Sequence, residues 1–472
     1  MYIFTIPRDT FDETNLDIRV IRNLIRLHIA LAKHLHENMN YYRGKHKIMA
    51  EDRQNKLVCN HAHDIADTAS SYFIGNPIAY ACEKDITPLM DALELAGADE
   101  ADGDNGLELS IYGLAYEYIY LAEDENILHI KNLSAEHTFM VKDDSIEEKE
   151  LFAVYYHIRK DDSRKTRDHF IATVLTQNLR YELDIEDCDQ PQAAAEGMPH
   201  YLGEIPMIEY QNNKLAIGDF ELQIPLIDAY NALMSDRVTD KEQFIDSILA
   251  IYGTLLVDDD DGEEDAGIKT FKDRLKKYKV LELPDTAKAE YLTRTFDEAG
   301  IEILKKAIEQ DIHKFSHIPC MTDESFGGNV SGVAMEFKLL GMEDITKIKT
   351  RYYRKGLRKR LRIFCNYLSI HQTVIDPSGI TMTFTRALPK NLLEISQIVS
   401  NLWGKVSKKT LLSQIPFVDD VERELEAVEE EEQEALQQQK ALFGNEPNTP
   451  PDDTAGEIGD HGGSKKEKQV KE

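Results

Sequence analysis

Two long helix-forming segments separated by a short insertion constrain the fold of this chain more than any other feature. The first is predicted over 225–252, where Pro225 suits a first helical turn and Gly253 a helix end. The second is predicted over 296–317, after the capping-box pair Thr295 and Glu298. Its apolar residues form one stripe at helical spacing: Ile301, Leu304, Ile308, Ile312 and Phe315. Two such helices can pair as a hairpin, with the insertion at its tip.

The chain before this hairpin mixes helices and strands. Apolar periodicity predicts helices over 16–42, 57–74 and 87–97, with Gly44 placed to end the first of them. Between 107 and 210, short β-rich runs separated by polar turns indicate an antiparallel sheet. The runs are 115–121, 127–130, 138–141, 152–158, 170–175 and 179–183. The predicted fold class is therefore α+β and mainly helical. A length of 472 residues and a mass of 54.0 kDa indicate two to four structural units.

The chain after the hairpin begins with a loop rich in glycine, serine and asparagine. A long helix is then predicted over 332–370, with an apolar seam formed by Tyr353, Leu357, Leu361, Phe364 and Leu368. A short strand over 381–385 and helices over about 390–402 and 407–435 follow. Residues 441–472 contain almost no apolar side chains, which is typical of a disordered tail.

Composition narrows the class of protein. Asp and Glu exceed Lys and Arg by 86 to 55, and a net charge of −31 argues against a protein that reads DNA sequence by its surface. The cysteines are scattered without a C-x-x-C pair, which favours reduced thiols: Cys59, Cys82, Cys188, Cys320 and Cys365. We find no signal peptide and no apolar run long enough to cross a membrane, so we expect a soluble, cytosolic chain at synthesis.

The sequence lacks the motifs of common enzymes and cofactor sites. No Gly-Lys pair fits a phosphate-binding loop, and neither H-E-x-x-H nor G-x-S-x-G occurs. The acidic run 258–265 fails as a calcium loop because Val257 and Ile268 occupy positions that need acids. His61, His63 and Asp64 lie close in sequence, but His63 would point away from the other two on a helix. We therefore predict no enzyme activity, no metal and no cofactor.

The predicted helix 332–370 carries a run of basic residues. Five of them fall on one side of the helix: Lys347, Arg351, Arg354, Arg358 and Arg362. Such a row can neutralise DNA phosphates. In a chain this acidic, pairing with carboxylates of the same or a neighbouring subunit is the favoured interpretation, and direct DNA contact is the alternative.

Several segments together resemble one family, the portal proteins of long-tailed bacteriophages. The early segments are 41–48 (YYRGKHKI), 67–78 (DTASSYFIGNPI) and 113–117 (GLAYE). The later ones are 205–213 (IPMIEYQNN), 225–231 (PLIDAYN) and 331–339 (SGVAMEFKL). Each motif is weak alone, but their order and spacing over about 40–435 make the combination specific.

The resemblance implies a twelve-subunit ring around a central DNA tunnel, built from parts called wing, stem, clip and crown. Carried onto this chain, the wing covers 1–224 and the wing return 332–388. The stem helices cover 225–252 and 296–319, the clip 253–295, the crown 389–440, and the tunnel loop 320–331. The tunnel-loop residues nearest DNA would be Ser325, Phe326, Gly327, Gly328, Asn329 and Val330. Candidate acids lining the stem are Asp236, Asp240, Glu302 and Glu309.

The resemblance also implies the partners of the ring. Double-stranded DNA would pass through it, moved by a separate terminase whose large subunit docks on the clip. A head–tail connector protein would follow, and major capsid and scaffolding proteins would act in early assembly. The chain would reside at the portal vertex of the virion's capsid and in the host cytoplasm during assembly, with no membrane partner. The alternatives are a DNA-binding or DNA-processing protein that uses helix 347–362, and an acidic helical scaffold.

Overall fold

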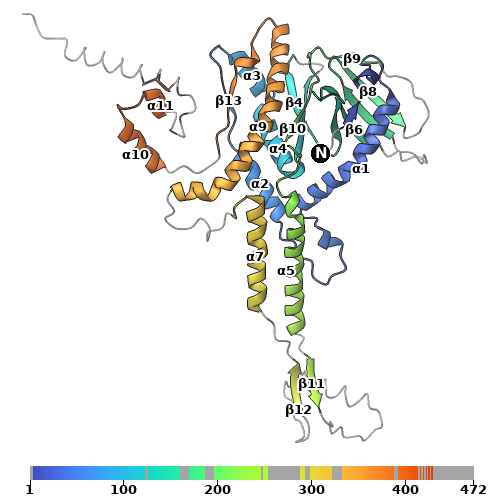
Figure 1. Cartoon of the computed structure of the whole chain (residues 1–472), viewed down its shortest axis with the longest axis vertical. Coiled ribbons are helices and arrows are strands. Elements are labelled where there is room, and N and C mark those ends of the chain that lie inside the picture. The colour runs from blue at the N-terminus through green and yellow to red at the C-terminus, as the bar shows by residue number, and fades with distance from the viewer. Residues whose placement is uncertain are drawn as a thin grey trace, which may run out of the picture. The chain divides into compact units, whose positions relative to one another are not determined.

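The computed structural model describes residues 4–122, 126–159, 169–186, 196–245, 248–252, 288–292, 298–320, 332–386 and 392–412, with single positions between 415 and 428. The chain divides into two compact units, Met1–Leu388 and Pro389–Glu472. The described part of the second unit includes α10 (Leu392–Leu402) and α11 (Lys408–Leu412). The first unit mixes helices and sheets (Figure 1), so the fold class is α+β, with about half of the described residues helical.

A six-stranded sheet forms one layer of the first unit. Its strands, in spatial order, are β1 (Phe4–Ile6), β5 (Thr138–Asp143), β6 (Glu150–Arg159), β7 (His169–Leu175), β8 (Leu179–Glu186) and β9 (Met198–Pro199). β1 pairs parallel to β5, and all other pairs are antiparallel. Helix α1 (Ile18–Tyr42) packs on this sheet, burying Ile21 and Ile25 among aromatic residues such as Phe139. Gly44 follows α1 with φ +77°, as a helix-ending glycine should.

A second, three-stranded sheet has β3 (Leu114–Leu121) between β4 (Leu128–Leu133) and β10 (Met207–Gln211). The sequence predicted all of the strands in 115–183 correctly, but it predicted one sheet where the structure has two. Residues 134–137 form a turn between β4 and β5, in which the amide of His137 donates to the carbonyl oxygen of Ser134. Alternation identifies a strand but does not identify its partner.

Helices α2 (His61–Ile74), α3 (Thr87–Leu95) and α4 (Ala98–Tyr112) pack beside this sheet. The sequence did not predict α4. Its segment is polar and contains Gly103 and Gly106, and buried residues lie around much of the helix, so no apolar stripe marks it. Gly113 ends α4 with φ +77°, and a side chain there would collide with the backbone of Ala216, only 2.3 Å away.

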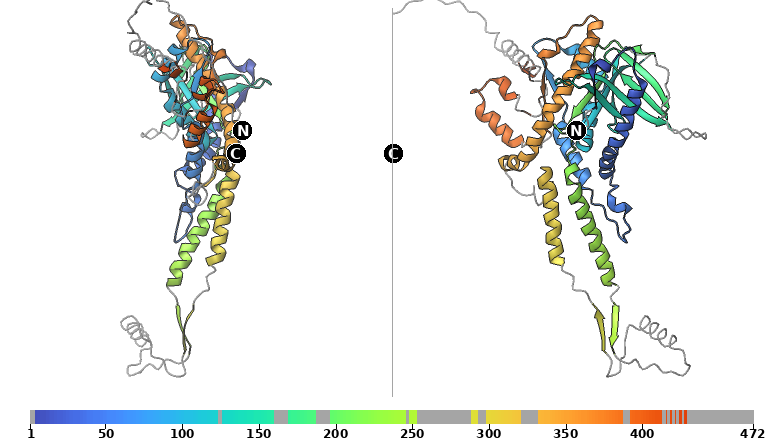
Figure 2. Two further views of the ribbon diagram at one scale, coloured as in Figure 1. Left: turned by 90° about the vertical axis from the view of Figure 1, so that its left-hand side faces the viewer. Right: turned by 45° about the vertical axis from the view of Figure 1, so that its right-hand side comes forward.

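The predicted helical hairpin is present as α5 (Ile224–Ile245) and α7 (Glu298–Ser316), which lie side by side in Figures 1 and 2. The first helix is shorter than the predicted 225–252. Residues Ile248–Tyr252 instead form strand β11, which pairs antiparallel with β12 (Lys288–Leu292). This segment, ILAIY, is rich in β-branched and aromatic residues, which favour a strand over a helix.

Helix α9 (Gly332–Ile370) is the longest element and matches the predicted 332–370. Its apolar seam is buried with α3 and the three-stranded sheet, and the short pair β2 (Ala79–Ala81) and β13 (Thr381–Thr383) lies in the same core. Several predictions fall outside the described residues: the tunnel loop from 321 to 331, most of the clip, the tail 441–472 and Cys188. Among the described residues the four other cysteines are free thiols, and no helix is long and apolar enough to cross a bilayer.

Candidate functional site

The sequence segments that carry the family resemblance meet where α5 joins α1 and α2. The hydroxyl of Tyr41 donates to the carboxylate of Asp228, at 2.7 Å from Oδ1. Asn231, one turn further along α5, contacts Nδ1 of His46 and accepts from the backbone amide of Cys59. Asp228 and Asn231 belong to the segment LIDAYN, and Tyr41 and His46 to YYRGKH. These motifs therefore fix the base of the hairpin to the rest of the unit.

A second contact links two of the same segments. The hydroxyl of Tyr42 donates to Oδ1 of Asp67 in α2, at 2.9 Å. Burial and this carboxylate together raise the pKa of Tyr42 to about 12, so the hydroxyl stays protonated and remains a donor. The Asn-Asn pair of the later motif closes a turn, because Asn212 and Asn213 both donate to the carbonyl oxygen of Ile217. The motif residues thus hold joints between elements.

Charged pairs connect the two helices of the hairpin. Arg237 of α5 donates to Glu302 at 2.9 Å and lies 3.4 Å from Glu298, both on α7. Lys241, one turn further along α5, also reaches Glu298. These pairs are partly exposed, so they set the register of the helices more than they stabilise the hairpin.

The four candidate stem acids have intramolecular surroundings of their own. Asp236 forms an ion pair with Arg53 at 2.7 Å, Glu302 pairs with Arg237, and Asp240 is also engaged by a neighbouring group. Glu309 is half-buried near Cys59 and His61. No described contact tests whether these side chains line a channel, so that assignment stays a prediction.

Helix α7 exposes part of its predicted apolar stripe. Ile312 is fully buried, but Leu304 is 51% exposed and Phe315 54% exposed, and the adjacent Ile303 is 70% exposed. Leu304 and Phe315 are eleven residues apart and therefore lie on one side of α7, where they form an apolar row that faces outward, while Ile303 is exposed on a neighbouring side. An exposed apolar row on a long helix favours contact with another protein.

The five candidate cations of α9 have different neighbours. Lys347 pairs with Asp344, Arg362 pairs with Glu204 at 2.5 Å, and Arg354 lies over the ring of Phe384. Within the described part of the chain, Arg351 and Arg358 are exposed and have no ion-pair partner. Pairing within the same subunit thus accounts for two of the five, and the interface and DNA interpretations of the others remain open.

Three further cations of α9 are buried, and they are not among the five predicted from the sequence. Lys349 pairs with Asp219 at 2.6 Å, Lys359 pairs with Glu150, and Arg360 is fully buried. The helical spacing contained the signal. Lys349 lies four residues before Tyr353, and Arg360 four residues before Phe364, so both fall on the apolar seam.

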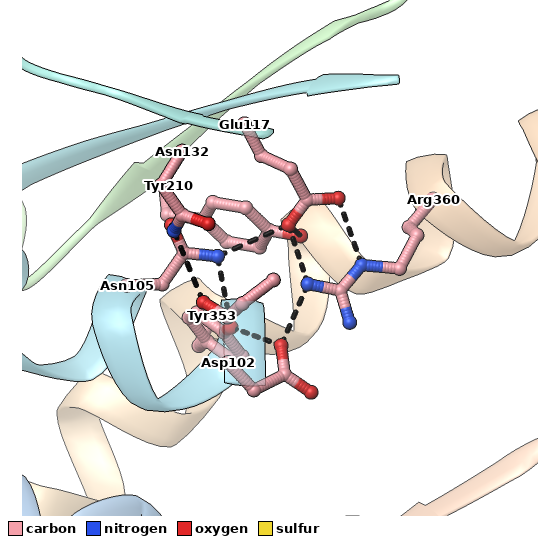
Figure 3. Close-up of polar contacts among 8 residues, drawn as sticks. Asp102, Asn105, Glu117, Asn132, Tyr210, Tyr353 and Arg360 are labelled. Atoms are coloured by element: carbon pink, nitrogen blue, oxygen red, sulfur yellow. Dashed lines mark hydrogen bonds and ion pairs between the residues drawn. The ribbon is translucent and has the colours of Figure 1, made fainter. Parts of the chain in front are cut away.

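Arg360 is the centre of a buried polar cluster that joins α9 to α4 and β3 (Figure 3). Its guanidinium contacts Glu117, with Nε 2.9 Å from Oε1, and Asp102, with Nη2 2.6 Å from Oδ1. Burial alone would lower the pKa of Arg360, but the two carboxylates raise it well above its ordinary value. Further hydrogen bonds join the carboxylates to nearby side chains: Asn105, Tyr210 and Tyr353. The cluster pairs one buried cation with two buried acids and fixes the position of α9.

The candidate metal residues do not converge. His61 stacks edge-on against Tyr230 and lies 5.6 Å from the ring of His313, while His63 pairs with Asp67 on the exposed face of α2. Among the described residues, no group of three or more potential ligands is placed to hold a metal ion.

Comparison with known proteins identifies the family. The model of the family described as "Phage portal protein, SPP1 Gp6-like" matches residues 21–438. This chain belongs to that family of phage portal proteins. Its members are structural, non-enzymatic proteins of the capsid vertex that take part in DNA packaging. The prediction that the chain is not an enzyme is thereby confirmed, and the portal interpretation is favoured over the two alternatives.

Individual relatives agree with the family. The portal protein of Bacillus phage SPP1 is 26% identical over 434 residues, covering 86% of this chain and 82% of the relative. The portal protein of Clostridium phage phiCD119 is 22% identical over 439 residues, covering 86% and 94%. A solved structure described as the neck of an empty GTA particle with C6 symmetry aligns with 75% of this chain and 90% of its own. Its sequence identity is 10% and its TM-score 0.42.

Proposed function

We propose that this portal protein assembles into a closed ring, and that DNA enters and leaves the capsid through the central channel. Family membership supports the role at the capsid vertex. The observation that carries the ring is the exposed apolar row of α7, because a single copy leaves Leu304 and Phe315 exposed to water. In a ring of identical copies the same row on every copy can pack against the next hairpin.

The parts of the chain then take the following roles. The hairpins α5–α7 form the channel wall, with twelve copies as the expected number. The segment 253–295 docks the terminase large subunit during packaging and a head–tail connector afterwards. The loop at 325–330 contacts the passing duplex, and the net negative charge keeps phosphates from adhering. Major capsid and scaffolding proteins surround the ring during assembly.

A single substitution on α7 tests the ring. We expect Leu304→Asp to place a charge in the contact between neighbouring hairpins. The fraction of protein in the large assembly, measured by sedimentation velocity, should fall at least about tenfold. The matched control is Leu27→Asp on α1, where the leucine is similarly exposed at 58%. The control should assemble like the natural chain. Normal assembly of Leu304→Asp would contradict a ring built on this row.

A further inference from the structure

A charged groove runs beside the exposed face of α9. It is a cavity of about 530 Å³ between α9, β10 and the β5–β6 region of the larger sheet. Three carboxylates of its wall each have a cation partner within the chain: Glu209 with Lys142, Glu150 with Lys359, and Glu204 with Arg362.

Two cations of the groove remain available. Lys355 and Arg358 are exposed and have no ion-pair partner among the described residues, and the half-buried Tyr352 lies beside them. The groove therefore presents two unpaired positive charges next to an aromatic surface. It suits a short acidic segment of protein.

An acidic surface lies on the same unit. The joint of α3 and α4, which we term the acidic elbow, exposes Asp91, Glu94, Asp99, Glu100 and Asp104. None of these five has an ion-pair partner among the described residues, and the sequence contains no lysine or arginine between Lys84 and Lys131. Leu95, at the turn of the elbow, is 65% exposed.

The helix dipoles explain the positions of only some of the acidic residues in this elbow. Asp99 and Glu100 lie in the first turn of α4, where the helix dipole favours acids. Glu94 lies in the last turn of α3, where the dipole disfavours them. Unpaired like charges around an exposed leucine, one of them in an unfavourable position, are typical of a surface that meets a cationic partner.

We infer that the acidic elbow of one copy docks in the α9 groove of the neighbouring copy. This contact lies outside the hairpin and rests on the proposed ring. A ring contact joins two different patches on each copy, and α9 separates the two patches here: it packs against α3 on one side and β10 on the other (Figure 1). Asp99 and Glu100 would pair with Lys355 and Arg358, and Leu95 would cover the apolar part of the groove.

Duplex DNA fits this groove less well than the elbow does. Three carboxylates alternate with the cations along the groove wall, and a continuous phosphate backbone would meet them. Two unpaired cations are enough to pair with the few carboxylates of a protein loop. They are too few to neutralise the row of phosphates on a duplex.

A charge-exchange experiment on the full chain tests the pairing. The groove variant is Lys355→Glu with Arg358→Glu, and the elbow variant is Asp99→Lys with Glu100→Lys. Each variant alone places like charges at every groove–elbow contact. We expect each to need at least about tenfold more protein to assemble, measured by sedimentation velocity at about 0.05 M salt.

An equal mixture of the two variants should restore assembly. Copies that alternate around an even-numbered ring would pair a reversed groove with a reversed elbow, and a natural groove with a natural elbow. A control with the same charge change outside both patches is Lys33→Glu with Lys45→Glu, both at exposed positions. It should assemble like the natural chain.

The possible outcomes separate this inference from the proposed ring. If the natural chain forms rings and the groove variant assembles normally, or if the mixture is not rescued, the groove–elbow pairing is wrong and the ring stands. If the natural chain forms open chains in place of closed rings, and the mixture of variants restores this assembly, the pairing is supported and the closed ring is contradicted. No self-association of the natural chain would overturn both. If the natural chain binds duplex DNA, and the groove variant loses this binding but assembles normally, the ligand of the groove is DNA and not the elbow.

Discussion

At the scale of single residues, Arg360 shows most clearly how the long helix is held. Its side chain is fully buried, and Asp102 and Glu117 are buried with it. A buried guanidinium with two carboxylates adds little net stability, but removing one partner leaves charge uncompensated.

We therefore expect Arg360→Ala to lower the free energy of unfolding by about 3–5 kcal/mol. Urea unfolding of the unassembled chain measures this change. Arg351→Ala on the exposed face of the same helix is the matched control, and it should change the free energy by less than about 0.5 kcal/mol. Equal effects of the two substitutions would show that the cluster does not hold α9.

His28 predicts a pH dependence. It is buried between α1 and the larger sheet, its Nδ1 lies 2.8 Å from the hydroxyl of Tyr156, and burial lowers its pKa from 6.5 to about 4. Because the unfolded chain binds a proton more readily, stability is lost as pH falls from about 6.5 towards 4, by up to about 3 kcal/mol.

Urea unfolding at several pH values tests this contribution with His28→Gln. The substitution should remove the His28 part of the slope between pH 6.5 and 4, and the matched control is His157→Gln, at an exposed position of β6. A slope that persists in His28→Gln would assign the pH dependence to other groups.

At the scale of elements, the sequence predicted what local periodicity encodes. The helix at 16–42, the strands between 115 and 183 and the long helix at 332–370 all follow from repeats of apolar residues. Helix α4 was missed because it is buried on several sides, so polar and small residues such as Asp102 and Gly106 replace the stripe. The division into two sheets, and the burial of Arg360 against Glu117, depend on contacts distant in sequence, which periodicity does not report.

The packing of α9 against β10 gives a prediction about two glycines. A side chain at Gly356 would place its Cβ 2.4 Å from the ring of Tyr210, whereas Gly103 in α4 has open space. We expect Gly356→Ala to destabilise the chain by about 1–3 kcal/mol, and Gly103→Ala to stabilise it by up to about 1 kcal/mol. Thermal unfolding of both variants measures the difference. A stabilising Gly356→Ala would mean that α9 and β10 are not in close contact.

At the scale of the whole molecule, the sequence resemblance predicted the family correctly, and the structure adds surfaces that a single copy leaves uncovered. Among the described residues, the apolar row of α7, the acids of the elbow and two cations of the groove have no partner. The candidate stem acids and the cations of α9 could be named from sequence. Their partners could not, because Arg53 reaches Asp236, and Glu204 reaches Arg362, only through the fold.

The most direct test of the ring is the native mass of the purified full-length chain, measured with negative-stain images of the same sample. Twelve copies of 54.0 kDa give a particle of about 650 kDa, and the images should show a closed ring with a central hole. A particle of 54.0 kDa at every protein and salt concentration, or open chains of variable length, would contradict the ring.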